Sequence, residues 1–368
     1  MNKLLFISSL LYKIILKKMN LKMKHGNKFG IHRVLEPIGS LPQSAIKISN
    51  DMEIYDNELL IDVDYLNIDS ASFSQLKEST EGDLEKIKQN ILHIVETRGK
   101  MQNPITGSGG MLIGSIEKIG NDLKEKLDLK IGDKIATLVS LSLTPLRIDK
   151  IIEIKPEIDR VKIKGKAILF ESGIYAKLPE DIEETLALAA LDVAGAPAQV
   201  KKIVKSKDIV LLLGATGKSG LMCSYMAKKV AGHNGKVIGQ ARNEIRAKFL
   251  KNTGFCDEII ICDVTQPLDV LEKTLKVNNN KEVDIAINCL SIPDTEMSSI
   301  LPVKDGGIVY FFSMATNFAK AALGAEGIGK DVSMIIGNGY TKNHAQITLD
   351  LIRESKILRR IFKEKYSK

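Results

Sequence analysis

Cysteine is scarce in this chain of 368 residues, and the four that occur never stand at the C-x-x-C spacing of a zinc knuckle or redox motif. All four lie in the second half, at Cys223, Cys256, Cys262 and Cys289. This scarcity argues against a disulfide framework and a structural zinc site. We therefore expect reduced core thiols in a cytoplasmic protein.

A long apolar run is also missing. The segment 1–22 starts basic and has an apolar stretch at residues 4–11, but Lys13 interrupts it before the roughly 20 residues that a membrane span needs. No small-x-small cleavage site follows. The sequence therefore predicts neither a signal nor an anchor, and no membrane partner. Residues 1–22 are rich in Asn, Lys, Leu, Ile, Phe, Tyr and Ser, the residues that AT-rich DNA encodes, and Met23 follows them in frame. We therefore expect translation to start at Met23.

Acidic residues are absent from those first 22 residues, which contribute five lysines to the formal net charge of +8. The remainder is close to neutral, and the chain has only 5% aromatic residues and no Arg-rich stripe. A phosphate-backbone binder usually has a concentrated basic surface. We therefore expect no nucleic-acid partner.

The chain length suits two domains.

The first half of the chain is dominated by short apolar runs between turns. Such runs occur at residues 58–63, 112–119, 133–139 and 166–170. This pattern predicts a largely β barrel or sandwich between residues 24 and 178. One amphipathic helix, residues 82–98, is expected to interrupt it.

From residue 183 the pattern changes to helices alternating with buried strands. A helix at 183–204 is expected to precede a strand at 209–213, and a glycine loop then leads to a helix at 218–230. Further strands are predicted at 236–239, 258–261, 283–288, 307–312 and 332–336, and a charged helix at 344–365 closes the chain. Apolar strands alternating with helices predict an α/β fold with a doubly wound parallel sheet.

The glycine loop has G-x-x-G-x-x-G spacing at Gly214, Gly217 and Gly220. Between a buried strand and a helix, such glycines allow a tight turn, close approach to a pyrophosphate and close helix packing. A P-loop would need glycine at position 212, where the chain has Leu212. The pattern predicts a nicotinamide dinucleotide site, with a loop that has lost its ligand as the alternative. The candidate cofactor-binding residues are Gly214, Thr216, Gly217, Lys218, Ser219, Gly220, Arg242 and Asn288.

The end of the second strand bears on the choice between NAD and NADP. An NAD site usually has Asp or Glu there, about 20 residues beyond the glycines. This chain has Gln240, Ala241 and Arg242 instead. Arg242 would pair with a 2′-phosphate and so favours NADP, whereas a solvated Arg242 at a strand end would favour neither. NAD and NADP both remain open.

The order of a β domain, a nucleotide fold and a C-terminal helix resembles the medium-chain dehydrogenases and quinone reductases. Local stretches also resemble them, at residues 63–72, 107–120, 129–135 and 172–177. The resemblance implies a GroES-like catalytic domain at residues 23–200 and a Rossmann domain at 201–345. It also implies a C-terminal helix at 346–368 that returns towards the catalytic domain, and a homodimer.

A closer resemblance, to the L-erythro-3,5-diaminohexanoate dehydrogenase family, depends on five longer strings. They are residues 24–28, 66–73, 99–104, 141–147 and 191–199. It implies NAD(P)-dependent oxidative deamination of that diamino acid to 5-amino-3-oxohexanoate and ammonia in anaerobic lysine fermentation, usually with NAD. A zinc-free quinone or enoyl reductase and a non-catalytic cofactor-binding protein are the alternatives.

The resemblance also implies the site residues. The metal ligands of zinc members align near Asp69, Gly110 and residues 192–194, where this chain has no His or Cys, so no metal is expected. A base must then activate water after the amine is oxidised. Asp69 or Asp192 would be that base or bind a substrate ammonium, and Arg147 would bind the carboxylate.

Glu171 and Tyr175 are further candidates. Each assignment has a structural alternative: Asp69 as a turn cap, Asp192 at a helix end, Arg147 on the surface and Tyr175 packed in the barrel.

Overall fold

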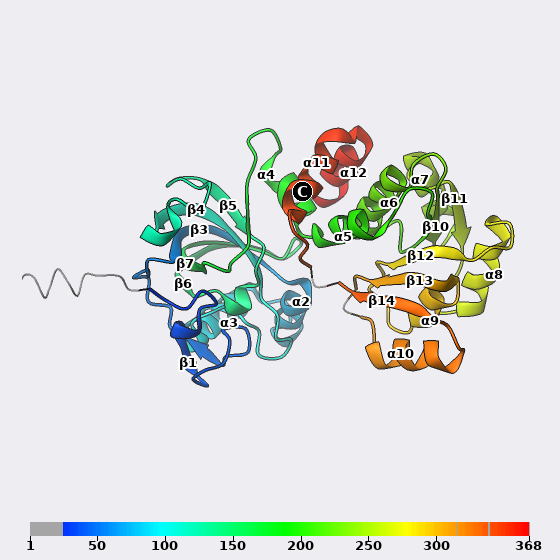
Figure 1. The fold of residues 1–368 in the computed structure, drawn as a ribbon. Coiled ribbons are helices and arrows are strands. Elements are labelled where there is room, and N and C mark those ends of the chain that lie inside the picture. The colour runs from blue at the N-terminus through cyan, green and yellow to red at the C-terminus, as the bar shows by residue number, and fades with distance from the viewer. Residues whose placement is uncertain (1–24, 314, 338, 368) are drawn as a thin grey trace, which may run out of the picture. The chain divides into compact units, whose positions relative to one another are not determined.

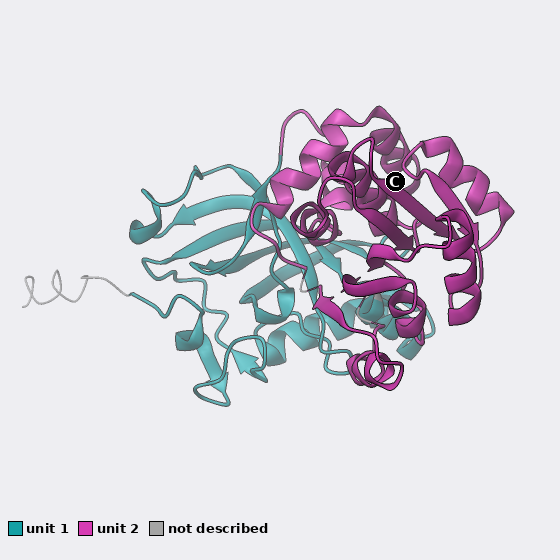
Figure 2. Cartoon of the chain, turned by 45° about the vertical axis from the view of Figure 1, so that its right-hand side comes forward, with its two compact units in different colours: residues 1–178 teal, residues 179–368 magenta. Residues whose placement is uncertain are grey.

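The computed structural model describes residues 25–313, 315–337 and 339–367. The chain divides into two compact units, the first ending at Leu178 and the second beginning at Pro179 (Figure 2). Segment 1–22 and the expected start at Met23 lie outside the described residues.

The first unit is built on a six-stranded sheet in the order β6-β7-β3-β4-β5-β8, with every neighbouring pair antiparallel. Strand β3, in the middle of this sheet, pairs with β4 on one side and β7 on the other, and most of its apolar residues are buried in the core. The strands are β3 (Glu58–Ile68), β4 (Gly110–Ile119), β5 (Lys134–Thr137), β6 (Leu146–Lys155), β7 (Arg160–Phe170) and β8 (Tyr175–Lys177).

Smaller elements surround this sheet. Strands β1 (Val34–Glu36) and β2 (Lys47–Ile48) form a separate antiparallel pair, and three 3-10 turns, η1 (Ile31–Arg33), η2 (Asn121–Leu123) and η3 (Leu141–Leu143), lie in the loops. The expected helix at 82–98 is present as α3 (Leu84–Arg98), which is capped by Asp83. A second helix, α2 (Ser70–Ser79), was not predicted, because its short polar sequence lacks a strong apolar period.

The second unit contains a parallel six-stranded sheet in the order β11-β10-β9-β12-β13-β14. The strand order reverses between β9 and β12, which is the switch point of a doubly wound sheet. The strands are β9 (Ile209–Leu213), β10 (Lys236–Ala241), β11 (Glu258–Ile261), β12 (Val283–Asn288), β13 (Val303–Phe311) and β14 (Val332–Ile336). Buried apolar side chains fill β9 and β12, as strands covered on both faces require.

Helices cover this parallel sheet on both faces (Figure 1). The helices α6 (Lys218–Ala231) and α7 (Glu244–Thr253) connect the strands on one side of the switch point. The others, α8 (Pro267–Val277), α9 (Glu296–Ile300) and α10 (Phe318–Gly327), make the remaining crossovers.

Two long helices expected from the sequence are each broken in two. The segment 183–204 forms α4 (Glu184–Leu191) and α5 (Gly195–Ile203), with a break at residues 192–194. The segment 344–365 forms α11 (His344–Glu354) and α12 (Lys356–Tyr366), because Ser355 ends one helix and caps the next through the Leu358 amide. Both C-terminal helices pack against α4 within the second unit.

The α/β fold class, with a GroES-like β domain and a Rossmann-type domain, is confirmed. In the part of the chain that the structure describes, no helix is both long enough and apolar enough to cross a membrane.

Candidate active site

The three glycines of the loop between β9 and α6 perform three different tasks. Gly214 has a φ of +76°, which L side chains rarely adopt. A Cβ on Gly220 would lie 2.1 Å from the Gly214 carbonyl oxygen, so this glycine allows α6 to pack on the loop. A Cβ on Gly217 would meet only the Gly214 oxygen, at 3.5 Å, so the space above Gly217 is open. This arrangement fits a pyrophosphate over Gly217.

The first turn of α6 also suits an anion. Its N-cap is Gly217, and no side chain caps the helix. Uncapped amides at a helix N-terminus attract phosphate groups. Thr216, Lys218 and Ser219 are half-buried around this turn.

Gln240 holds the loop in place from the neighbouring strand. Its buried side chain accepts a hydrogen bond from the Gly214 amide at 3.1 Å and donates one to the Cys262 carbonyl at 3.0 Å. The side chain at this strand end therefore fixes the loop backbone. The sequence reasoning assigned no role to Gln240.

The switch point brings the end of β12 against the glycine loop. The Cys289 amide donates to the Leu213 carbonyl at 3.0 Å. The Asn288 side chain is fully buried and bonds the hydroxyls of Thr295 and Ser299, both at 2.9 Å. Asn288 therefore shapes the segment after β12, and direct contact with a cofactor stays a prediction.

Arg242 follows the last residue of β10 and is exposed. Asn243 then caps α7 by accepting a hydrogen bond from the Arg246 amide. The structure thus places one exposed guanidinium at the position where a ribose hydroxyl or 2′-phosphate is usually read. The choice between NAD and NADP remains open.

Lys218 and Asp192 form an ion pair beside the glycine loop, with Nζ and Oδ2 separated by 2.6 Å. Asp192 is the C-cap of α4, so it lies at a helix end, which was the alternative to a catalytic role. The Lys218 ammonium also lies 5.6 Å from the centre of the Tyr366 ring, which belongs to the last turn of α12. The pair is partly exposed, so its charges are accessible to a ligand.

Asp69 lies directly after β3 in the first unit and caps α2. Its Oδ1 accepts hydrogen bonds from the Ala71 amide at 3.0 Å and from the Ser108 hydroxyl at 3.1 Å. The backbone amide of Asp69 donates to the Gly109 carbonyl, so Asp69 and Gly110, the two positions that align with metal ligands of zinc members, are adjacent. Gly110 has a φ of +109°, and a Cβ there would lie 2.0 Å from the Asn67 oxygen. Only glycine allows this close approach.

The other candidates of the first unit lie in separate local networks. Arg147 is exposed and bonds Asp149 at 3.1 Å. Glu171 accepts from Asn57 and Lys126, and these contacts outweigh burial and lower its carboxyl pKa. Burial raises the pKa of Tyr175, aided by nearby Asp128 and Asp133. The structure does not bring Arg147, Glu171 and Tyr175 together with Asp69 through any hydrogen bond in the described ranges, and their roles stay predictions.

Metal ligands do not gather in the described part of the chain, where no three His, Cys, Asp or Glu side chains cluster suitably. The expectation of a metal-free site is a prediction from the absence of His and Cys at the aligned positions.

Lys100 is a buried charged residue that sequence reasoning did not single out, although it lies in the string 99–104. Its Nζ donates to the Pro42 carbonyl at 2.6 Å, and its side chain is inaccessible to solvent. Burial, helped by the charge of Arg98, lowers its pKa to about 8. Lys100 thereby holds the loop before β2 against the end of α3.

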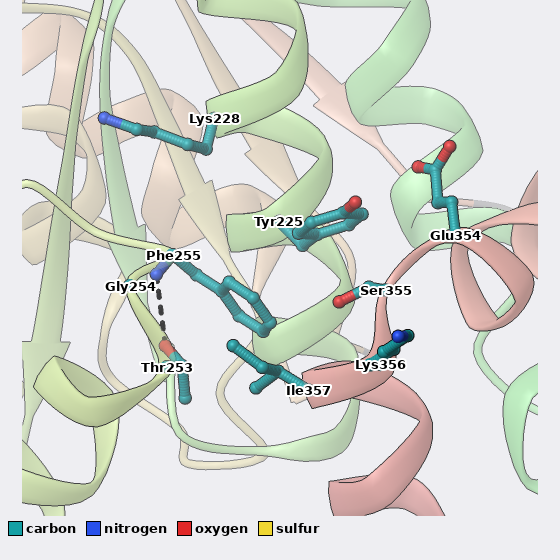
Figure 3. Close-up of a pocket in the computed structure, with 9 residues that line it drawn as sticks. All are labelled: Tyr225, Lys228, Thr253, Gly254, Phe255, Glu354, Ser355, Lys356 and Ile357. Atoms are coloured by element: carbon teal, nitrogen blue, oxygen red, sulfur yellow. Dashed lines mark hydrogen bonds between the residues drawn. The ribbon is translucent and has the colours of Figure 1, made fainter.

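A cavity of about 470 Å³ lies elsewhere on the second unit (Figure 3). The rings of Tyr225 and Phe255 line it, and their centres are 5.1 Å apart. Neither the glycine-loop residues nor Arg242 line it. It is therefore separate from the nucleotide site.

Known proteins resemble this chain at two levels. At the level of fold, it has a TM-score of 0.51 to an alcohol dehydrogenase from Thermus sp. ATN1, with 15% identity and coverage of 86% of this chain and 87% of that one. The CurK enoyl reductase gives 0.50, with 15% identity and coverage of 84% and 78%. A mycobacterial protein complexed with NADPH also gives 0.50, with 14% identity and coverage of 84% and 81%. These similarities establish the fold.

At the level of sequence, residues 32–179 match the L-erythro-3,5-diaminohexanoate dehydrogenase N-terminal domain. The enzyme of that name from Acetoanaerobium sticklandii is 66% identical over 341 residues, covering 93% of this chain and 99% of the relative. Its counterpart from Fusobacterium nucleatum is 66% identical over 344 residues, covering 94% and 100%. The chain therefore belongs to the L-erythro-3,5-diaminohexanoate dehydrogenase family.

Proposed function

We propose that the protein is an NAD(P)-dependent amine dehydrogenase that oxidises L-erythro-3,5-diaminohexanoate. With water and the oxidised cofactor, the products are 5-amino-3-oxohexanoate, ammonia and the reduced cofactor. The observation that carries the proposal is 66% identity over almost the whole length of two relatives with that name. The open space above Gly217 supports the use of a dinucleotide. Anaerobic lysine fermentation is the proposed metabolic setting.

The residues of the loop would hold the cofactor. Backbone amides of the first turn of α6 would bind the pyrophosphate, and Arg242 would lie beside the adenosine ribose. A bound nicotinamide supplies a hydride acceptor for the substrate carbon that carries the amine. We retain residues 201–345 as the cofactor domain, 23–200 as the catalytic domain and 346–368 as the returning C-terminal segment.

The protein's own side chains have to manage protons and substrate charge. In this proposal Asp69 takes a proton during deamination, because its exposed carboxylate follows the central strand of the substrate domain. Asp192 and Lys218 provide an ion pair beside the cofactor loop, and the carboxylate of that pair would bind a substrate ammonium. Arg147 stays the candidate for the substrate carboxylate. Glu171 and Tyr175 remain candidates of lower structural support.

The test is a comparison of substrates with purified protein. We expect reduction of NAD or NADP with L-erythro-3,5-diaminohexanoate and release of one ammonia per reduced cofactor. Quinones and enones, offered with the reduced cofactor, test the reductase alternative. Cofactor binding without any of these reactions would overturn the proposal and favour a non-catalytic protein.

Asp69 is tested separately by Asp69→Asn. We expect turnover to fall by about 100-fold or more, the usual contribution of a general base, while the Kd of NADH stays unchanged. Helix capping is largely preserved because Asn also caps helices well. Turnover near the wild-type value would remove Asp69 from the mechanism.

We also propose a homodimer formed through β14, which is an edge strand of the parallel sheet. Ile336 on this strand is an exposed apolar side chain, and the preceding helix α10 carries two more, Phe318 and Leu323. An unpaired edge with apolar neighbours favours pairing with a second copy. Light scattering should give twice the chain mass, and a monomer would overturn this assignment. The four free cysteines support a cytoplasmic location.

A further inference from the structure

Three hydroxyl groups form a connected chain that ends on the Asp69 carboxylate. Ser72 Oγ lies 2.6 Å from Thr106 Oγ1 and 2.6 Å from Ser108 Oγ. Ser108 Oγ in turn lies 3.1 Å from Asp69 Oδ1. The four side chains come from two segments more than thirty residues apart in the sequence, so the fold has brought them together.

The directions of these hydrogen bonds follow from counting protons. An ionised carboxylate only accepts, so Ser108 donates its single hydroxyl proton to Asp69. The Ser108 oxygen is then the acceptor for Ser72, and the Ser72 oxygen is the acceptor for Thr106. All three protons therefore point towards Asp69.

The two ends of the chain differ from its middle in exposure. Ser72 is fully buried, whereas Asp69 and Thr106 are exposed to solvent and Ser108 is half-buried. A buried hydroxyl linked on both sides is a continuous path between two accessible groups. The Thr106 end can exchange protons with water while a substrate covers Asp69.

The loop that carries Thr106 and Ser108 is held rigidly. Asn103 is completely buried, and its Oδ1 accepts from the amides of Ile105 and Thr106. Its Nδ2 donates to the Ser72 carbonyl and to Gln75, which fastens the loop to α2. The hydroxyls are thus pre-positioned by satisfied hydrogen bonds, as an efficient proton path requires.

We propose that Ser108, Ser72 and Thr106 relay a proton between Asp69 and solvent during turnover. The inference rests on the proposed role of Asp69. When Asp69 accepts a proton from a substrate ammonium or from attacking water, it becomes a hydrogen-bond donor to Ser108, and the three hydroxyls rotate so that their protons point away from Asp69. Asp69 then passes its proton to Ser108. Ser108 gives its own proton to Ser72, Ser72 to Thr106, and Thr106 to water. One proton enters at Asp69 and one leaves at Thr106, and no group is oxidised or reduced.

A direct contact of 3.2 Å between Thr106 Oγ1 and Ser108 Oγ offers a shorter second route. Ser72 can therefore be bypassed, whereas Ser108 is common to both routes and Thr106 is their outlet. This makes Ser108→Ala and Thr106→Val the decisive substitutions. Thr106→Ser keeps the hydroxyl and is the matched control.

The experiment measures steady-state kinetics of full-length protein with the diamino acid. We expect kcat to fall at least tenfold in Ser108→Ala and Thr106→Val, with KM and the Kd of NADH within twofold of wild type. Thr106→Ser should keep the wild-type kcat. Added imidazole should raise kcat in the two impaired variants but not in wild type, since a small base replaces the missing path. In both variants the solvent isotope effect on kcat should also differ from the wild-type value.

Two results would overturn the relay. One is a kcat within twofold of wild type in Ser108→Ala and Thr106→Val, with an unchanged solvent isotope effect. The other is a loss that imidazole does not restore or that Thr106→Ser shares, which would indicate a structural role. Asp69→Asn distinguishes a failure of the relay from a failure of the proposed role of Asp69. A lowered kcat in Asp69→Asn with a wild-type kcat in Ser108→Ala rejects the relay alone. Normal turnover in both also rejects Asp69 as the base.

Discussion

Adding one methyl group at Gly217 should abolish tight cofactor binding without unfolding the protein. Gly217 has φ −81° and ψ 174°, which any residue adopts, and the nearest atom to a new Cβ is the Gly214 oxygen at 3.5 Å. Replacing a glycine N-cap by alanine changes stability by less than about 1 kcal/mol. The folded protein should therefore tolerate Gly217→Ala.

The methyl group would instead occupy the space through which a pyrophosphate approaches the helix amides. Losing one charge-assisted hydrogen bond costs about 1.5–3 kcal/mol. Because 1.4 kcal/mol corresponds to a tenfold change, the Kd of NADH or NADPH should rise about 10- to 150-fold. Emission of the reduced nicotinamide reports this titration cleanly, since the chain contains no tryptophan.

Two other glycines are controls for this experiment. Gly327→Ala places a Cβ with no neighbour within 4 Å and should change neither binding nor stability. Gly220→Ala forces a Cβ to 2.1 Å from the Gly214 oxygen, so it should lower the melting temperature as well as the affinity. Wild-type affinity in Gly217→Ala would refute the assignment of this loop as the pyrophosphate site.

Three further changes test other parts of the molecule. Arg242→Asp should raise the ratio of the NADPH Kd to the NADH Kd by at least about tenfold, because it replaces a cation by an anion at the ribose. An unchanged ratio would remove Arg242 from cofactor selection. Lys218→Met should weaken NADH binding several-fold. The free energy of unfolding should change by less than about 1 kcal/mol, because the ion pair of Lys218 with Asp192 is partly exposed. Unaltered NADH binding would argue against a contact between Lys218 and the cofactor. Burial raises the pKa of Glu58, but hydrogen bonds from Arg33 and His32 and the Arg33 charge outweigh it and lower that pKa to about 2. The stabilisation is present above the ordinary carboxyl pKa and lost as the pH falls towards 2, so wild type should lose about 3 kcal/mol of unfolding free energy over that range, and a Glu58→Gln variant with the same acid dependence would contradict this.

The sequence was most informative where the pattern depends on neighbouring residues. Strand β9 was predicted at its observed bounds because a continuous apolar run marks a strand buried in a parallel sheet. Strands β12 and β14 were also predicted at their observed bounds, although Asp284 and Ser333 interrupt their apolar residues. The spacing of Gly214, Gly217 and Gly220 likewise predicted the loop, since each glycine satisfies a local backbone requirement.

Features that depend on distant residues were not predictable in this way. The helix α2 has little apolar periodicity and depends on Asp69 as its cap. The contact of Ser72 with Thr106 and Ser108 joins two segments that are distant in sequence, and Asn103 fastens the second segment to α2. The break between α4 and α5 was missed because apolar residues continue on both sides of Asp192, although Gly195 and Pro197 in the first turn of α5 are a helix-start signal.

Gln240 and Arg242 both stand at the end of the second Rossmann strand, but only Gln240 bonds the glycine loop. The Gln240 amide is committed to the backbone of the glycine loop, whereas Arg242 extends into solvent and supports no part of it. Substitutions at position 242 can therefore accumulate without disturbing the loop on which binding depends. Under the proposed role of Arg242, a substitution there would change cofactor preference while the glycine loop keeps its geometry.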